Sequence, residues 1–237
     1  MELHDNYKKK IFISAAETSS DIHGAHLLKS LKSLIKEQKP SYDVSFFGVG
    51  GVHLKNNGLR AVFDSSSFLS MGIGEILTRI PFFFHAYYSL VKEIKTQKPD
   101  LAVLMDYPGF HFLLARKLKK LNIPMVYYIP PKVWVWRKYR VHFLRKVFKK
   151  VLCVFPFEEE FFHNYGVNCK YVGNPLLDEL KVKRSKDEIK NKYSIREKDK
   201  ALLLMPGSRP AEINSHLLIM LHSVSLVKKE LRDKGVV

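Results

Sequence analysis

Short apolar runs alternate with longer amphipathic stretches along most of this chain. The apolar runs are Ile11–Ser14, Val44–Val49, Leu101–Asp106, Met125–Ile129, Val151–Phe155, Tyr171–Gly173 and Leu202–Met205. Helical periodicity marks the stretches Asp21–Glu37, Ile76–Gln97, Phe110–Leu121 and Glu158–Tyr165. Apolar strands buried on both faces and separated by helices are typical of parallel βαβ units. The pattern therefore predicts an α/β fold with an open, doubly wound parallel sheet.

One highly charged stretch, KVKRSKDEIKNKYSIREKDK, interrupts the alternation. It is typical of a surface helix and a linker between domains. The strand–helix alternation restarts at Ala201. We therefore expect a nearly complete Rossmann-like domain over residues 10–180 and a linker over 181–200. Residues 201–237 would form the first strand and helix of a second Rossmann-like domain.

The composition fits a folded protein, since 46% of the 237 residues are hydrophobic. Cys153 and Cys169 lie in or near apolar runs, which favours a reducing compartment over a disulfide framework. The start of the chain lacks the pattern of a signal peptide. No segment reaches the roughly 18 uncharged apolar residues of a membrane span. These features favour a cytoplasmic protein.

The charge is +17 and unevenly distributed: no Asp or Glu stands between Asp106 and Glu158, where Lys and Arg occur twelve times. Such a region attracts phosphates of nucleic acid, nucleotide or an anionic membrane leaflet. Solubility charge on helix faces explains the composition equally well. No RNA-binding signature such as an RRM or KH motif is present.

The turn after the first strand, SAAETSSDIHGA, holds two carboxylates, Glu17 and Asp21. Ser19, Ser20 and Asp21 are candidates to cap the next helix, whose free N–H groups would hold an anion. A helix cap with a solvated acid is an equally good interpretation.

Asp106 ends the otherwise apolar strand of LAVLMDYPGFH. In open α/β sheets ligands bind beyond the carboxyl ends of the strands. A carboxylate there suits a general base that takes a proton from a hydroxyl. A structural cap of the next helix is the alternative, and we favour the functional interpretation.

Two segments combine exposed aromatic and apolar candidates. In the first, FLSMGIGEILTRIPFFFHAYYSLV, the three consecutive phenylalanines cannot all face a single-sided core, so an acyl chain or lipid interface competes with core packing. In the second, YYIPPKVWVWRKYR, aromatics interleave with cations, as suits nucleic acid, a membrane interface or a sugar phosphate. The candidate contacts are Met71, Ile73, Ile76, Phe82, Phe83, Phe84, Trp134, Trp136 and Arg137.

The last motif, PGSRPAEI, follows the strand that begins near Ala201. Gly207 permits close backbone approach, and Ser208 suits a helix cap. Arg209 suits a bidentate grip on phosphate, and Glu212 adds a carboxylate to the first helical turn. The motif lacks the lysine of a P-loop, which disfavours ATP hydrolysis.

Taken in order, AAETSSDIHGA, FFGVGG, MGIGEIL, PDLAVLMDYPGFH, VWVWR, FPFEEEFF, VGNPLLDEL and LLLMPGSRPAEI closely resemble the lipid-A-disaccharide synthases. These are inverting glycosyltransferases of the GT-B type. The resemblance implies that the 6-hydroxyl of 2,3-diacylglucosamine 1-phosphate attacks the anomeric carbon of UDP-2,3-diacylglucosamine, giving UDP and a β-1,6 disaccharide for lipid A.

The resemblance also implies roles for residues of this chain. Asp106 matches the proposed base. Glu17, Ser19 and Asp21 match the first-strand motif, and the PGSR…E residues Gly207, Ser208, Arg209 and Glu212 are expected near the UDP of the donor. No metal or other cofactor is implied, and no nucleic-acid partner. The protein would work at the cytoplasmic, anionic surface of the inner membrane.

Members of this family run well past 300 residues, so the resemblance implies that most of the donor domain lies outside this sequence. We expect the chain alone to be inactive or nearly so, unless another polypeptide completes it. Two rival functions stay open. One is another GT-B enzyme that uses a UDP-sugar with a different acceptor, and the other is a non-enzymatic basic module that binds RNA or membrane.

Overall fold

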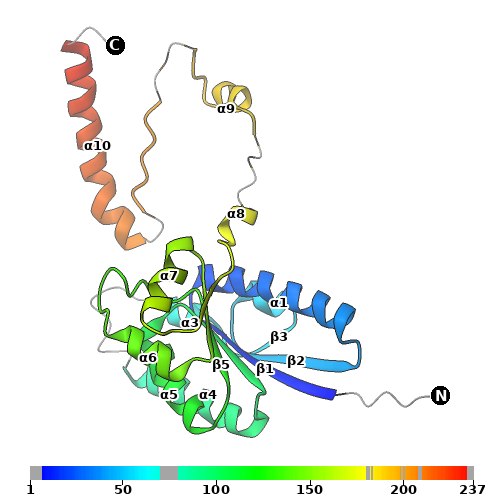
Figure 1. The fold of residues 1–237 in the computed structure, drawn as a ribbon. Helices are drawn as coiled ribbons and strands as arrows, with labels where there is room; N and C mark the ends of the chain where they lie inside the picture. Colours follow the sequence, from blue (N-terminus) through cyan, green and yellow to red (C-terminus); the bar gives the residue numbers. More distant parts are fainter. Residues whose placement is uncertain are drawn as a thin grey trace. The chain divides into compact units, whose positions relative to one another are not determined.

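A computed structural model describes residues 7–69, 80–179, 182, 184–197, 199, 201–207 and 210–233 of the chain. It divides into two compact units, residues 1–179 and 180–237. Figure 1 traces both units in chain order. We describe each unit by itself. The predicted contacts Met71, Ile73, Ile76, Ser208 and Arg209 lie outside the described residues.

The first unit is built on a seven-stranded sheet in which every pair of neighbouring strands is parallel. The strand order is β3-β2-β1-β4-β5-β6-β7. The strands are β1 (Tyr7–Ala15), β2 (Tyr42–Val49), β3 (Leu59–Phe63), β4 (Leu101–Met105), β5 (Met125–Tyr128), β6 (Lys150–Cys153) and β7 (Cys169–Tyr171). The predicted doubly wound α/β sheet is confirmed. The chain reverses its direction of winding between β1 and β4, and that is where ligands bind in such sheets.

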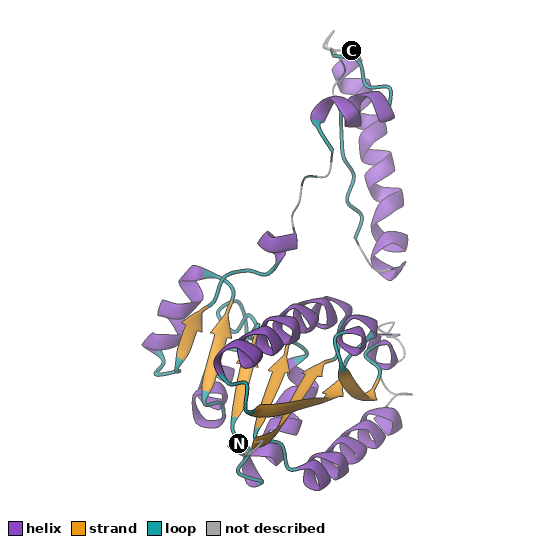
Figure 2. Cartoon of the chain, turned by 90° about the vertical axis from the view of Figure 1, so that its right-hand side faces the viewer, coloured by secondary structure: helices purple, strands orange, loops and turns teal. Residues whose placement is uncertain are grey.

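Helices lie on both faces of this sheet (Figure 2). They are α1 (Thr18–Gln38), α2 (Val52–Asn56), α3 (Ser66–Leu69), α4 (Ile80–Gln97), α5 (Pro108–Lys120), α6 (Arg140–Val147), α7 (Pro156–Asn164) and α8 (Leu176–Glu179). Side chains of α4, α5, α6 and α7 pack in one apolar cluster, and those of α1 and α2 in another. The sheet is therefore covered on each side by its own core.

Alternation along the central strands explains the two cores. Phe12 and Leu104 contribute to the cluster under α4 to α7, while Ile13 and Val103 contribute to the cluster under α1 and α2. Successive side chains of a strand point to opposite faces, so a strand with both faces covered is apolar throughout. Each fully buried side chain of this kind contributes about 1.5–3 kcal/mol.

Several elements differ from the sequence-based expectations. Strand β3 was not predicted, and neither were helices α3, α6 and α8. The expected strand at Leu202–Met205 forms no ladder, although the stretch was predicted as a strand. A strand is defined by its pairing, and within the described part of the second unit there is no other strand beside it.

The described residues of the second unit include the helices α9 (Lys186–Lys192) and α10 (Pro210–Asp233). Helix α9 begins with a capping box, in which the Ser185 side chain accepts from the Glu188 N–H at 3.2 Å and the Glu188 carboxylate accepts from the Ser185 N–H at 2.7 Å. None of its residues is buried. No helix in the described part of the chain combines the length and the apolar composition of a membrane span.

Candidate functional site

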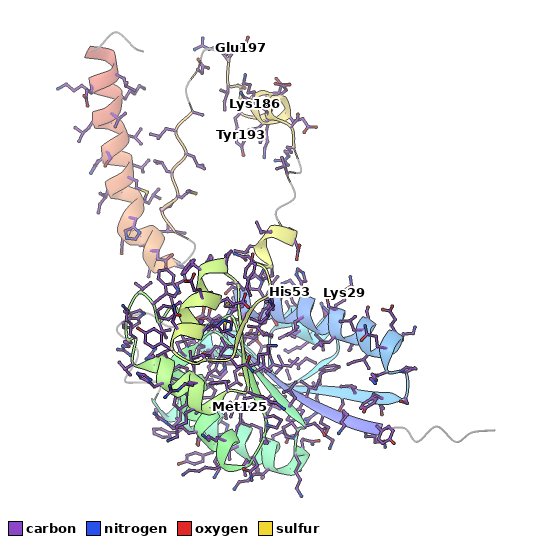
Figure 3. The ribbon with its side chains drawn as sticks, in the orientation of Figure 1. Lys29, His53, Met125, Lys186, Tyr193 and Glu197 are labelled. Carbon is purple, nitrogen blue, oxygen red and sulfur yellow. The ribbon has the colours of Figure 1, made fainter. Side chains whose placement is uncertain are left out.

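The candidate site lies at the carboxyl edge of the sheet, where β1 and β4 end side by side. Ser14 is in register with Leu104, and Ala15 with Met105, so the two strands finish together. Asp106 follows β4 directly. Figure 3 labels His53 near the start of α2, the helix that follows the carboxyl end of β2. It also labels Met125, the first residue of β5, which lies toward the amino edge of the sheet.

Asp106 and Tyr107 both have left-handed backbone conformations, with φ of 53° and 43°. Such conformations cost non-glycine residues about 1–3 kcal/mol each and persist only where the surroundings hold them. The Tyr107 N–H donates to Asp106 Oδ1 at 2.9 Å. The carboxylate is half-buried and is oriented by this bond.

A buried network fixes this backbone. The Asp106 carbonyl oxygen accepts from His111 Nδ1 at 2.7 Å and from the Tyr127 hydroxyl at 2.6 Å. The other ring nitrogen, His111 Nε2, lies 2.8 Å from Ser14 Oγ on β1. A carbonyl can only accept, so Nδ1 carries the proton and Nε2 accepts from the serine hydroxyl. The network ties β1, β5 and α5 to the main chain of residue 106.

Burial governs the charge states in this network. It lowers the pKa of His111 to about 4, although the bond to the Asp106 carbonyl raises it. Burial also raises the pKa of Tyr127 well above its usual value. The pKa of Tyr107 rises to about 12, first through burial and then through the negative charge of Glu17. All three side chains are therefore neutral near pH 7, and Glu17 lies near Tyr107.

Sequence reasoning missed Ser14, His111 and Tyr127. Their signal is present but weak, since each is a polar group within a stretch of apolar residues. Ser14 and His111 are 97 positions apart in the sequence. Only the pairing of β1 with β4 brings them together.

Asp21 holds the start of helix α2 in place. Its carboxylate, 2% exposed, accepts N–H bonds from Gly51, His53 and Leu54 at 2.6, 3.0 and 3.1 Å. It therefore caps α2, whereas the sequence suggested a cap of its own helix. Close packing explains Gly51, because a Cβ there would lie 2.7 Å from the Asp21 carboxylate.

Asp21→Ala is expected to lower the free energy of unfolding by about 2–3 kcal/mol, because it leaves buried N–H groups without an acceptor. Urea unfolding of the 237-residue chain measures the loss. Ser19→Ala is the matched control, since Ser19 is exposed in the same helix and should change stability by less than about 0.5 kcal/mol. Equal losses in the two variants would contradict the capping role.

The remaining residues of the first turn are more accessible. Glu17 is the half-buried N-cap residue of α1, and its side chain makes no capping bond. Ser19 is exposed. The proximity of Glu17 to Tyr107 brings the first-strand turn next to Asp106. The structure thus places Glu17 and Asp106 in the same part of the carboxyl edge.

The three consecutive phenylalanines of α4 differ in burial, because adjacent residues of a helix face different directions. Phe82 and Phe83 pack against the core, and Phe83 stacks on Tyr107 with ring centroids 6.5 Å apart. Phe84 is 52% exposed and stacks on exposed Tyr88. The prediction that at least one of the three points away from the core is confirmed for Phe84.

The two tryptophans also differ in their surroundings. Trp134 Nε1 donates to the buried carboxylate of Glu158 at 3.0 Å, which holds the indole in place. Trp136 is 58% exposed, and the Arg137 guanidinium lies 4.3 Å from its ring centroid. Of the pair, Trp136 with Arg137 therefore presents the accessible aromatic and cationic surface.

In the second unit, the described part of the PGSR…E motif is compact. Gly207 has φ of +128°, and a Cβ on it would lie 2.6 Å from the Glu212 side chain. Glycine is therefore required at position 207. Glu212 is half-buried in the first turn of this helix.

Comparison with protein families gives one match that covers nearly the whole chain. The lipid-A-disaccharide synthetase family matches residues 11–237. Lipid-A-disaccharide synthases from Myxococcus xanthus and Geobacter metallireducens are 34% and 36% identical, each over 93% of this chain and 56% of the relative. The chain thus spans about half the length of the curated relatives it matches.

Solved structures show the same fold at low identity. A UDP-N-acetylglucosamine 2-epimerase aligns with 75% of this chain and 52% of its own, with a TM-score of 0.54 and 14% identity. The S. aureus MnaA–UDP co-structure aligns with 80% of this chain and 51% of its own, with a TM-score of 0.51 and 15% identity. These likenesses concern the fold alone, a parallel α/β sheet with helices on both faces.

Proposed function

Because this chain belongs to the lipid-A-disaccharide synthetase family, we propose that it is the acceptor-binding half of a glycosyltransferase of lipid A biosynthesis. The complete protein would join UDP-2,3-diacylglucosamine to 2,3-diacylglucosamine 1-phosphate. The observation that carries the proposal is the family match over residues 11–237, which places Asp106 within the matched region.

Asp106 is the proposed general base. The Tyr107 N–H donates to Asp106 Oδ1, and this bond orients the carboxylate. Among the bonds of the described residues, Oδ2 has no donor, so it would take the proton from the 6-hydroxyl of the acceptor. As the O–H bond breaks, the oxygen forms a bond to the anomeric carbon of the donor. The bond from that carbon to the UDP oxygen breaks with its electron pair, and the configuration inverts.

The diphosphate of the donor is the proposed ligand of the PGSR…E residues Gly207, Ser208, Arg209 and Glu212. Phosphate binding is also the role proposed for Glu17, Ser19 and Asp21 of the first-strand turn. The bonds that Asp21 makes to α2 favour an indirect contribution, through the shape of the turn. Backbone N–H groups and basic side chains would stabilise the leaving UDP, with no metal required.

The acyl chains and the membrane surface would meet the aromatic candidates. Phe84 and Trp136 are exposed large apolar side chains, and such side chains suit a lipid interface when cations accompany them. Phe83 connects α4 to Tyr107 and thus to the residue beside Asp106. The protein would therefore bind peripherally at the anionic inner membrane, on the cytoplasmic side.

The 237-residue chain assayed alone is expected to show no transfer between the two lipid substrates above background, because the two domains of a GT-B enzyme close over both. Transfer should appear when residues 1–237 are continued by the remaining part of the Geobacter metallireducens relative. Radiolabelled acceptor separated by thin-layer chromatography measures the product. Detectable turnover of the two lipid substrates by residues 1–237 alone would contradict this prediction.

A further inference from the structure

A pocket of about 300 Å³ lies between α5 and α6. Its walls combine aromatic rings with two arginines, Arg116 on α5 and Arg140 at the start of α6. None of the candidate site residues named in the sequence analysis lies on its walls. The mixture of ring faces and guanidinium groups is unlike a plain packing defect, since a packing defect would be lined by apolar side chains alone.

The two guanidinium groups lie over a pair of tilted aromatic rings. Phe112 and Phe143 lie with ring centroids 4.7 Å apart, one from each helix. Arg140 lies 5.4 Å from the Phe112 centroid, and Arg116 lies 5.4 Å from the Phe143 centroid. A cation above an aromatic face is attracted to the ring without using its N–H donors. The rings therefore position both arginines and leave their donors free.

No carboxylate neutralises this pair within the described part of the chain. Within the described residues, the guanidinium groups of Arg116 and Arg140 contact aromatic rings and no carboxylate. The surrounding sequence, residues 107–157, contains no Asp or Glu. Two adjacent cations without a counter-ion repel each other, and a bound dianion relieves that repulsion. Guanidinium pairs bind phosphate by parallel N–H bonds.

The pocket adjoins the candidate base. Pro108 and Gly109, which follow Asp106 by two and three positions, form part of its wall. Arg140 is also close enough to Tyr127 to favour the ionised form of that phenol, and the Tyr127 hydroxyl bonds to the Asp106 carbonyl. A sugar whose hydroxyl reaches Asp106 therefore has this pocket beside it.

We propose that Arg116 and Arg140 bind the anomeric phosphate of the acceptor glycolipid in this pocket. The inference rests on the proposed function and adds a specificity site to it. The phosphate bonds to the two guanidinium groups, and the 6-hydroxyl on the other side of the sugar ring reaches Asp106. The site thereby selects a sugar 1-phosphate over the same sugar without phosphate.

The test is calorimetric titration of the 237-residue chain with a short-chain 2,3-diacylglucosamine 1-phosphate and with its dephosphorylated counterpart. We expect the phosphate to tighten binding at least tenfold. Arg116→Gln and Arg140→Gln should each weaken binding of the phosphorylated compound about tenfold and leave the dephosphorylated one unchanged. Arg140→Lys should recover part of the loss, since it keeps the charge but not the planar fork.

Arg145→Gln is the matched control, because Arg145 is exposed on α6 and does not line the pocket. It removes the same charge and should leave the phosphate preference intact. Equal affinity for both compounds, absence of phosphate-dependent binding, or equal losses in Arg145→Gln and the pocket variants would overturn the proposal. Circular dichroism confirms that each variant is folded.

Failure of the proposed function and failure of the pocket assignment give different experimental results. If the protein continued with the Geobacter metallireducens segment makes the disaccharide while binding ignores Arg116 and Arg140, the pocket assignment alone is wrong. If phosphate-dependent binding requires both arginines but that protein transfers no sugar, the pocket assignment stands and the glycosyltransferase function is wrong.

Discussion

Asp106→Asn is expected to reduce the rate of sugar transfer by a factor of about 10² to 10⁴, the range that a general base contributes. The measurement uses the protein in which residues 1–237 are continued by the remaining part of a curated relative. Asparagine keeps an oxygen that accepts the Tyr107 N–H but has no carboxylate to take the proton. The loss should therefore lie in kcat, with little change in KM.

The control for this variant is binding. Asp106→Asn should retain the phosphate-dependent affinity of the acceptor and the urea midpoint of the parent chain, because neither depends on proton transfer. Retained activity would remove Asp106 from its role. The rival interpretation, a non-enzymatic basic module that binds membrane or RNA, predicts instead that neither protein transfers sugar, that Asp106→Asn changes nothing, and that binding weakens steeply with salt.

Acid should destabilise the first unit by about 3 kcal/mol through His111 alone. Burial lowers the pKa of His111 from 6.5 to about 4 in the folded chain, and each pH unit of such a difference is worth 1.36 kcal/mol. Between these two values the unfolded chain binds a proton that the folded chain does not. Stability is therefore unaffected by this group above pH 6.5, falls as the pH drops toward 4, and then levels off.

Urea unfolding between pH 7 and pH 4 measures this effect against His111→Gln. The variant should be less stable at pH 7, because Ser14 and the Asp106 carbonyl lose a partner, and its stability should fall less steeply in acid. His53→Gln is the control, since His53 is exposed and its removal should leave the slope unchanged. Identical slopes for His111→Gln and the parent chain would show that the imidazole is not kept neutral by the fold.

Most of the sheet could be predicted because its strands are apolar on both faces, which few other elements are. β3 was missed since its five residues include Arg60 and only Leu59 is buried. Helix α6 was missed because its buried positions are only Val141 and Leu144, among several cations. Periodicity is detectable only where enough apolar positions repeat.

Only those site residues that directly follow an apolar strand could be predicted from the sequence. Asp106 was identified because it follows an apolar strand, a local feature of the sequence. The role of Asp21 depends on α2, 30 positions further along the chain. The contact between Arg140 and Phe112 likewise exists only because α5 and α6 pack together. Such contacts depend on which elements pack together in three dimensions. No fixed spacing of residues along the sequence indicates them.

The central position of β1 and β4 has a consequence for how the molecule opens. Both strands have neighbours on each side, whereas β3 and β7 are the edge strands of the sheet. Edge strands open by local unfolding with less free energy than central ones. Amide hydrogens of β1 and β4 should therefore exchange with solvent last. Asp106 is thus attached to the part of the sheet that stays closed while the edges fluctuate, and its carboxylate keeps its direction through those fluctuations.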